Sequence, residues 1–457
     1  MMRAGPSASL RQLLVALPLA LAAMTVAAQA DNARPGMQNL SSVYRSALTN
    51  DPDYQAALDN FRAAAEAEPQ ALAALLPELQ ARGSYNRVRQ SIDGDFFGVS
   101  EIDETDVFDR SAYGATLRQP LFRFDAFLGL DRSELEVGRA RLLLTDERHA
   151  LMLSAAQSYF ALLAAKDERE FVLAEESAIR RQVEQTEGSF DAGLIAETDL
   201  KAVQAQLDRV RARKITVENR IEIVRSRLET LIGEPVNELA RFPRDPQLPD
   251  MEHEQLDEWL ERAMRHNLDL LSETVRLRLA EMDTRIAQSD HYPTLDLVGS
   301  YTYFDADGGF EGAREDHDAR IGVMLSVPLF QGGMTASRVR QARARAAAVA
   351  HTADGARQQA RLNTREAFLN AKAARARAEA LKRVVESTRS AEESAQVAFD
   401  VGSRTAADYL TAVRERFRAE RDLSQARYDY ILDLLRLRRA AGVMTVADLE
   451  DLNRSLR

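Results

Sequence analysis

The chain contains one long segment twice, and this duplication constrains its fold more than any other feature. Residues 190–233 read FDAGLIAETDLKAVQAQLDRVRARKITVENRIEIVRSRLETLIG, and residues 399–442 read FDVGSRTAADYLTAVRERFRAERDLSQARYDYILDLLRLRRAAG. They align without a gap, and the matched positions include Phe190 with Phe399, Gly193 with Gly402, Asp199 with Asp408, and Gly233 with Gly442. Two long copies predict one duplicated fold, because a solenoid has more and shorter repeats.

Each copy predicts a hairpin of two long helices. A glycine follows the first aromatic residue and ends one helix, and a polar segment with an Asp begins the next. In the first copy apolar residues recur every three or four positions, with Lys214 in the one slot that breaks the pattern. The apolar positions are Leu200, Val203, Leu207, Val210, Val217, Ile221, Val224, Leu228 and Leu231. This spacing is typical of a coiled-coil seam, so the helix needs a partner helix.

The duplication extends beyond these hairpins. Ala47 aligns with Ala263, and Asp53 aligns with Asp269. Downstream, PELQARGSYN at 77–86 aligns with PTLDLVGSYT at 293–302, and YGATLRQPLF at 113–122 aligns with IGVMLSVPLF at 321–330. Helical stretches follow at 124–188 and 333–399, and a Pro-rich linker covers 233–252. We therefore predict a first repeat at 31–242 and a second repeat at 243–457, which ends in a C-terminal equatorial segment.

The four repeated segments of ten residues predict β-strands in two hairpins. In the first segment Leu79, Ala81, Gly83 and Tyr85 alternate with Gln80, Arg82, Ser84 and Asn86, as strands with one apolar face require. We expect polar, acidic loops at 87–112 and 304–320. Strands of this length with one apolar face are typical of membrane-spanning strands, and a sheet in a soluble protein shows the same pattern.

Geometry limits what such strands can do in a membrane. Four strands cannot close a barrel, and unpaired backbone groups at a sheet edge are costly in lipid. If the strands lie in a membrane, several chains must therefore contribute to one barrel. Two or three copies both give an even strand number of eight or more, and the sequence pattern does not choose between them.

The N-terminus predicts export. Arg3 and Arg11 precede an apolar run at 13–23, and Ala28-Gln29-Ala30 follows, which is typical of a signal peptide over residues 1–30. The chain has no Cys and therefore no disulfide framework. Its formal net charge of −11 disfavours nucleic-acid binding, which needs a basic surface. No later stretch is apolar over ~18 residues, so we expect no membrane-spanning helix.

The sequence lacks the patterns of an enzyme. The six His are scattered without the spacing of metal ligands, and no Gly-x4-Gly-Lys-Ser/Thr phosphate loop occurs. We therefore predict no catalytic residues, no cofactor and no metal site. Energy for any transport would have to come from partner proteins.

The order and spacing of these motifs resemble the TolC family of bacterial outer-membrane efflux proteins over essentially the whole mature chain. The motifs are the duplicated Phe-Asp-x-Gly tips, the LPEL and YPTL starts of the first strands, the QPLF and VPLFQGG ends of the second strands, and the ARYDYILDLLRLRRAAG terminus at 426–442. No single motif decides the resemblance, but their order and duplication together are specific.

The resemblance implies a mixed α and β fold in a homotrimer. Twelve strands, four from each chain, would form one transmembrane β-barrel in the outer membrane, and long antiparallel helical hairpins would form an α-barrel across the periplasm. The implied function is the exit duct of a tripartite efflux pump or a type I secretion system. The implied partners are outer-membrane lipid, a periplasmic adaptor protein and an inner-membrane transporter of the RND or ABC type. The cargo is not predicted.

The resemblance also implies roles for residues at the hairpin tips. The adaptor would dock at Gly193, Leu194, Gly402 and Ser403. The periplasmic gate would use Thr198, Asp199, Phe399, Arg404, Asp408 and Thr411. In the family, the residues at the positions of Thr198 and Asp199 bind the counterpart of Arg404 when the entrance is closed. Asp408 matches an acidic residue that forms a ring around the entrance. Phe399 and Thr411 depart from the family pattern, which has a Tyr and a second carboxylate there, so one latch is lost and the entrance is less acidic.

A second hypothesis is a periplasmic coiled-coil adaptor or scaffold protein, whose alternating segments form an ordinary sheet. The paired strand segments favour the duct, because a scaffold does not need two copies of them in step with the duplicated helices.

Overall fold

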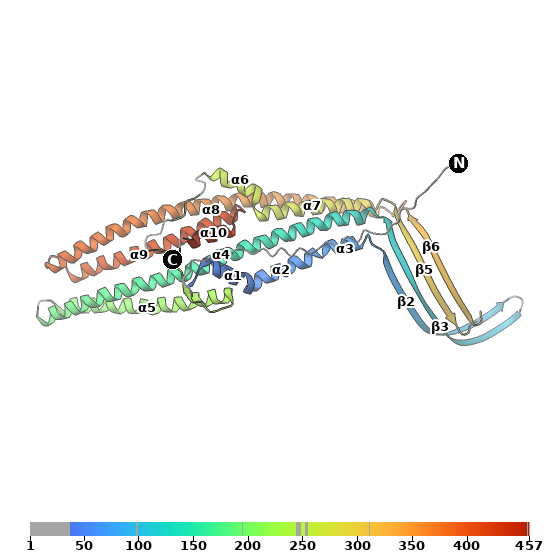
Figure 1. Ribbon diagram of the computed structural model, residues 1–457, viewed down its shortest axis with the longest axis horizontal. Coiled ribbons are helices and arrows are strands. Elements are labelled where there is room, and N and C mark those ends of the chain that lie inside the picture. The colour runs from blue at the N-terminus through green and yellow to red at the C-terminus, as the bar shows by residue number, and fades with distance from the viewer. Residues whose placement is uncertain are drawn as a thin grey trace, which may run out of the picture.

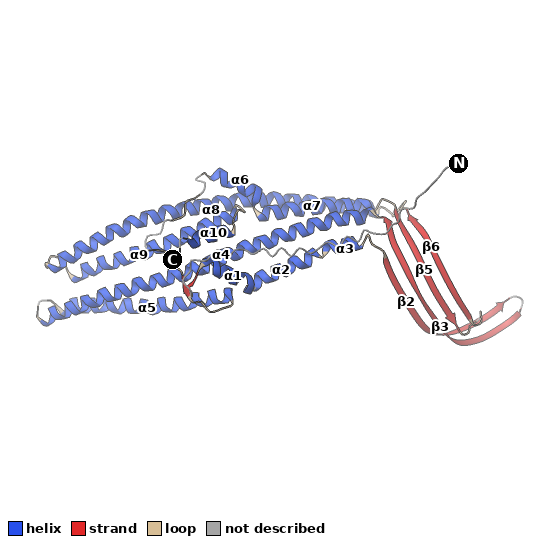
Figure 2. Cartoon of the chain, in the orientation of Figure 1, coloured by secondary structure: helices blue, strands red, loops and turns tan. Residues whose placement is uncertain are grey.

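The structure is a computed structural model that describes residues 37–96, 99–193, 195–243, 248–251, 255–309, 311–454 and 456. The predicted signal peptide at 1–30 lies outside these residues. The molecule is elongated, with the strands of one sheet at one end of a long helical body and two helical hairpin tips at the other end (Figures 1 and 2). Among the described residues, no helix has an apolar stretch long enough to cross a bilayer.

The two halves contain corresponding elements in the same order, except that the single helix α7 takes the place of α2 and α3 and that α10 follows only the second half. The first half consists of α1 (Leu40–Asn50), α2 (Pro52–Ala65), α3 (Ala67–Ala73), β2 (Glu78–Phe96), β3 (Val99–Phe122), α4 (Phe124–Asp191) and α5 (Glu197–Ile232). The second half consists of α6 (Leu256–His266), α7 (Leu268–Ser289), β5 (Thr294–Ala306), β6 (Arg314–Ser326), α8 (Met334–Asp400) and α9 (Ala406–Ala440), followed by α10 (Val446–Arg454). The predicted long helices are confirmed. With 68 residues, α4 spans about 100 Å.

The break between α1 and α2 and the break between α6 and α7 have the same cause. The side chain of Asp51 accepts a hydrogen bond from the N–H of Tyr54 and begins α2. The side chain of Asn267 accepts one from the N–H of Leu270 and begins α7. Short polar side chains at this position satisfy N–H groups that have no partner within the helix.

The predicted seam of α5 is confirmed at eight of its nine positions. At the end of the helix the structure buries Ile232 completely and leaves Leu231 only partly buried, because Ile232 lies four residues after the buried Leu228 and so on the same face. Lys214 fills the polar slot of the seam, and its Nζ lies 3.2 Å from Oε2 of Glu176 on α4. This bond lowers the pKa of Glu176, so the break in the apolar pattern is occupied by an ion pair.

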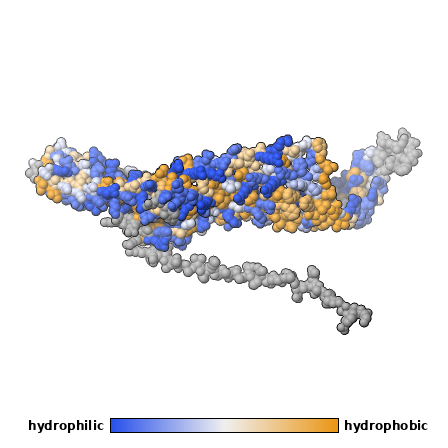
Figure 3. Space-filling model, turned by 90° about the horizontal axis from the view of Figure 1, so that it is seen from above, coloured by the Kyte–Doolittle hydropathy of each residue, from blue (hydrophilic) through white to orange (hydrophobic). Residues whose placement is uncertain are grey.

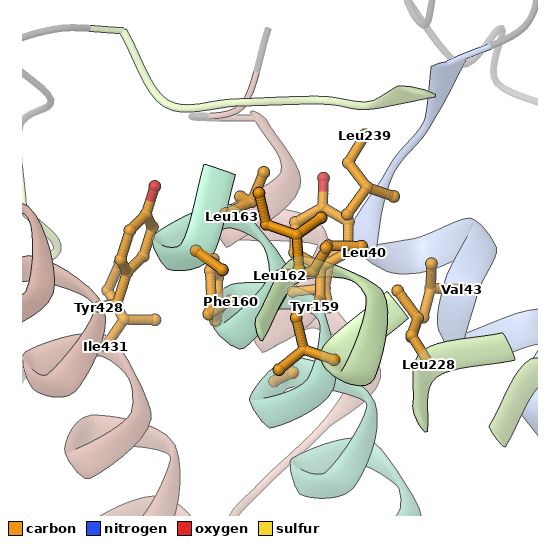
Figure 4. Close-up of a cluster of buried hydrophobic side chains, with 14 of the residues drawn as sticks. Leu40, Val43, Tyr159, Phe160, Leu162, Leu163, Leu228, Leu239, Tyr428 and Ile431 are labelled. Atoms are coloured by element: carbon orange, nitrogen blue, oxygen red, sulfur yellow. The ribbon is translucent and has the colours of Figure 1, made fainter. Parts of the chain in front are cut away.

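The main core lies midway along the helical body, where the linker crosses the long helices. Figure 4 shows side chains from α1, α4, α5, α9 and the linker meeting there, among them Leu40, Tyr159, Phe160, Leu228 and Leu239. A two-residue parallel pair joins β1 (Met37–Gln38) to β4 (Glu238–Leu239), which the sequence did not predict. The core therefore fixes the linker between the halves. Trp259, on α6, is fully buried.

A polar contact also joins α4 to α9 in this region. The Ser424 and Tyr428 hydroxyls both donate to Oδ2 of Asp167, at 2.7 and 2.8 Å. Burial raises the pKa of Asp167 despite these two hydrogen bonds. The ring of Tyr428 stacks on Phe160 at 5.5 Å, so the carboxylate is enclosed beside an aromatic cluster.

The four long strands form one antiparallel sheet in the order β2-β3-β5-β6. The predicted alternation is confirmed, since Leu79 and Tyr85 are exposed on the same face as Tyr113, Tyr301 and Ile321. In the described sheet β2 and β6 are the two edges, each with a partner on one side only. Apolar surface also gathers where the helical body joins the strands (Figure 3).

The predicted loop at 87–112 is wrong. Strand β2 continues to Phe96 and β3 begins at Val99, so most of this segment is a paired ladder, with Arg87 opposite Asp109 and Ser91 opposite Thr105. Polar side chains do not prevent a strand when the backbone is paired and the side chains reach water. The predicted loop at 304–320 is likewise shorter, because β5 ends at Ala306 and β6 begins at Arg314.

Candidate functional site at the hairpin tips

The two hairpin tips lie together at the end of the molecule farthest from the sheet (Figure 1). Each tip turns at a glycine in the left-handed region, Gly193 with φ of 69° and Gly402 with φ of 73°. Their N–H groups donate to the carbonyls of Phe190 at 2.8 Å and Phe399 at 2.9 Å. A residue with a Cβ would be strained at this φ, so the duplicated glycine is explained by the turn. Leu194 lies outside the described residues.

Several hydrogen bonds close the second tip. The backbone N–H groups of Ser403 and Arg404 both donate to the carbonyl of Ala398, at 2.8 and 3.2 Å, and the Ser403 hydroxyl donates to the same oxygen at 2.9 Å. These bonds satisfy a carbonyl at the C-terminal end of α8, which has no partner within the helix. The exposed backbone of this tip is therefore held in one conformation.

A capping box begins α9. Oγ1 of Thr405 accepts from the N–H of Asp408, while the Asp408 carboxylate accepts from the N–H and the hydroxyl of Thr405. The side-chain bond from Thr405 is the largest of several causes that lower the pKa of Asp408, and the charge of Arg404 adds to them. Asp408 is exposed and carries a negative charge at neutral pH.

The described residues of the first tip have a different arrangement at the helix start. Ala196 precedes α5 and makes no side-chain cap, and the N–H of Asp199 donates to its carbonyl at 3.1 Å. Thr198 and Asp199 are exposed in the first turn of α5. A carboxylate at this position interacts favourably with the N–H groups of the first turn, which have no partner within the helix.

The structure brings the predicted gate residues to one end of the molecule without joining them within one chain. In the described part of this chain no ion pair connects Arg404 to Asp199. The Thr411 hydroxyl donates to the carbonyl of Ala407 at 2.8 Å, inside its own helix.

Phe399 has a contact that the sequence did not predict. Its ring stacks on Tyr409 with centroids 5.9 Å apart and an interplanar angle of 16°. Burial raises the pKa of Tyr409, so this ring belongs to the packing between α8 and α9. A Tyr on α9, ten residues after an aromatic residue at the end of α8, is the only sequence signal for this pair.

Comparison with known sequences decides what this arrangement is. A family model described as outer membrane efflux protein matches residues 43–234 and 259–443, one match in each half. The chain belongs to this family of outer membrane efflux proteins. It is therefore an outer-membrane protein that takes part in efflux, and its helical body lies in the periplasm. Membership in this family contradicts the hypothesis of a periplasmic adaptor or scaffold protein.

Curated relatives of this efflux protein match nearly its full length. Outer membrane protein TolC of Vibrio cholerae is 32% identical over 423 residues, which cover 92% of this chain and 94% of that protein. Alkaline protease secretion protein AprF of Pseudomonas aeruginosa is 29% identical over 426 residues and covers 89% of this chain and 85% of its own length.

Solved structures confirm the fold of the efflux protein. A membrane protein from Pseudomonas aeruginosa superposes with a TM-score of 0.73 at 20% identity, over 88% of this chain and 90% of that chain. The outer membrane protein VceC of Vibrio cholerae superposes with a TM-score of 0.71 at 19% identity, over 88% of this chain and 96% of that chain. The long helical hairpins and the four-stranded sheet are thus a fold that this chain shares with those two membrane proteins.

Proposed function

We propose that three copies of this chain assemble into a continuous exit duct across the outer membrane and the periplasm. One observation carries the proposal: an open sheet with one apolar face and two unpaired edges stands at the end of helices about 100 Å long. In lipid such edges must be paired by other chains. Three copies contribute twelve strands, an even number within the range of bacterial barrels. The apolar face would contact outer-membrane lipid.

The hairpin tips then point toward the inner membrane and bind a periplasmic adaptor protein through Gly193, Leu194, Gly402 and Ser403. An inner-membrane transporter of the RND or ABC type delivers the cargo and supplies the energy, and this chain conducts passively, without catalysis or cofactor. Relatives named for protease secretion and for pyoverdine export support both a protein-secretion role and a small-molecule role for such a duct.

We further propose that the tips form a gate that is closed at rest. Arg404 of one copy would pair with Asp199 and contact Thr198 of a neighbouring copy, while Asp408 lines the entrance. An exposed ion pair contributes about 1 kcal/mol or less, so three pairs bias the closed state by up to about 3 kcal/mol, roughly a hundredfold. Binding of an adaptor can overcome a bias of this size. Three Asp408 carboxylates in a narrow aqueous entrance would favour cations over anions.

Single-channel conductance in planar lipid bilayers tests both proposals. The wild-type protein is expected to give small steps, and Asp199→Ala or Arg404→Ala is expected to give larger or longer openings, because the pairs that hold the closed state are lost. Arg62→Ala is the matched control, since Arg62 forms an exposed ion pair with Asp59 on α2, far from the tips. No steps from any variant would refute the duct. Equal steps from wild type and both tip variants would refute the gate alone.

A further inference from the structure

The two β-hairpins differ at the end of the sheet that points away from the helices. β5 ends at Ala306 and β6 begins at Arg314, whereas β2 and β3 stay paired beyond this level as far as Phe96 (Figure 2). The turn between β5 and β6 begins at Asp307, and Phe310 lies outside the described residues. The turn of the second hairpin therefore lies beside strands of the first.

This turn is hydrogen-bonded to β3. The N–H of Asp109 donates to Oδ1 of Asp307 at 2.7 Å, and the N–H of Asp307 donates to the carbonyl of Asp109 at 3.2 Å. The N–H of Gly309 donates to Oδ2 of Asp106 at 2.6 Å. Each bond satisfies a backbone group of the turn or of β3, so the turn is held in place on the strand.

Two glycines let the turn pass directly over an aromatic ring. A Cβ built on Gly308 would lie 2.7 Å from Cβ of Phe108, and one built on Gly309 would lie 2.8 Å from Cζ of the same side chain. Gly309 also has a φ of 98°, which a residue with a Cβ rarely adopts. Phe108 is only 5% exposed. Both glycines are therefore explained by the close approach of the turn to this ring.

The turn lies on the polar face of the sheet. Phe108 lies an odd number of residues from Tyr113 and so on the face opposite to the apolar side chains. Arg110 shares the face of Phe108, and its guanidinium carbon lies 5.4 Å from the ring centroid of Phe108 and 5.5 Å from that of Phe304. In the proposed duct the apolar face contacts lipid, so the polar face lines the lumen. The turn would then stand inside the barrel.

We propose that this turn, with Asp307, Gly308 and Gly309 of each copy, forms a fixed constriction at the outer end of the duct. The helices join the sheet where β5 begins and β6 ends, so the turn lies at the end that faces the outside of the cell. Each copy adds one turn at the same level of the barrel, and the hydrogen bonds to β3 keep it there. The outlet limits the size of the cargo independently of the hairpin tips, which lie at the opposite end. This inference rests on the proposed duct.

Thiol labelling of intact cells measures the constriction, because the chain has no Cys. Ser300→Cys places a thiol on the polar face of β5, between the turn and the helices. A series of polyethylene-glycol maleimides of increasing size, added outside the cells, gives the largest reagent that reaches this thiol. Ser91→Cys, on the exposed part of β2 beyond the turn, should react with every reagent and shows that the protein reaches the surface.

Releasing the turn should widen the outlet. In the Ser300→Cys protein, Asp106→Ala is expected to raise the labelling rate of the smallest excluded reagent about tenfold, because the N–H of Gly309 loses its acceptor. Asp106→Asn is the matched control, since it removes the same charge but keeps an oxygen as acceptor, and its labelling should equal that of the parent. Gly308→Val should act like Asp106→Ala, because the added side chain meets Phe108.

The outcomes separate the constriction from the duct. Equal labelling of the parent, Asp106→Ala and Gly308→Val by every reagent would overturn the constriction, as would equal gains from Asp106→Asn and Asp106→Ala. A Ser300→Cys thiol that reacts with no reagent in any variant, while Ser91→Cys reacts, would refute the proposed duct itself, because the polar face would then not line an open lumen.

Discussion

At the scale of the residue, Asp167 shows how one half-buried carboxylate joins the two halves. Its Oδ2 accepts from Ser424 and Tyr428, and burial raises its pKa. Because the folded pKa lies above the unfolded one, its contribution to stability is complete below the unfolded pKa of about 4 and is lost as the pH rises through the folded pKa. Asp167→Asn keeps one oxygen as acceptor for both hydroxyls and removes the buried charge.

We therefore expect Asp167→Asn to change the free energy of unfolding at neutral pH by less than about 1 kcal/mol, and to weaken its dependence on pH in the acidic range. Asp167→Ala leaves the buried Tyr428 hydroxyl without its acceptor and should cost about 1–3 kcal/mol. Thermal unfolding at several pH values measures both effects. Equal destabilisation by Asn and Ala would show that the charge itself, not the acceptor, holds this contact.

Residue-level prediction from the sequence succeeded where the cause is local. The glycine turns at Gly193 and Gly402 follow from the Phe-Asp-x-Gly motif and are confirmed. The bonds of Asp167 join residues 257 positions or more apart, and no pattern along the chain encodes such a pair. The gate roles of Asp199 and Arg404 stay predictions, because they depend on contacts between copies.

At the scale of the element, the start of α9 makes a specific prediction. Thr405→Ala removes the capping box and should destabilise the first turn of α9 by about 1 kcal/mol, which faster amide hydrogen exchange at residues 406–410 would report. The same change should raise the pKa of Asp408 toward its ordinary value, because the bond from Thr405 is the main cause that lowers it. Thr411→Ala is the control, since its hydroxyl bonds only a carbonyl of its own helix. Equal exchange in the two variants would contradict the capping role.

Whole elements were predicted best where a long period repeats. The helices α4, α5, α8 and α9 and the four strands follow from apolar spacing and from their duplication. The sequence does not predict the extension of β2 to Phe96, because charged residues in that segment are typical of a loop, whereas pairing with β3 holds its backbone. The pairing of β1 with β4 was missed because two-residue strands carry no periodicity.

At the scale of the whole molecule, the ends of the chain's long axis have different chemistry. One end has strand edges and an apolar face, and the other has exposed hairpin tips that carry both charged and apolar side chains. In the described part of a single copy both ends are incomplete, since β2 and β6 each have a partner on one side only and no ion pair joins Arg404 to Asp199. The same assembly of copies would complete the sheet and the gate together.

The most direct test of this account is the number of chains in the protein extracted from outer membranes, measured by native mass spectrometry in detergent. The account predicts a single dominant species of three chains, because three sets of four strands close the sheet and bring three pairs of hairpin tips together. A dominant monomer under conditions that preserve the helical fold would contradict it, because the edges of β2 and β6 would then lack the partners on which the duct depends.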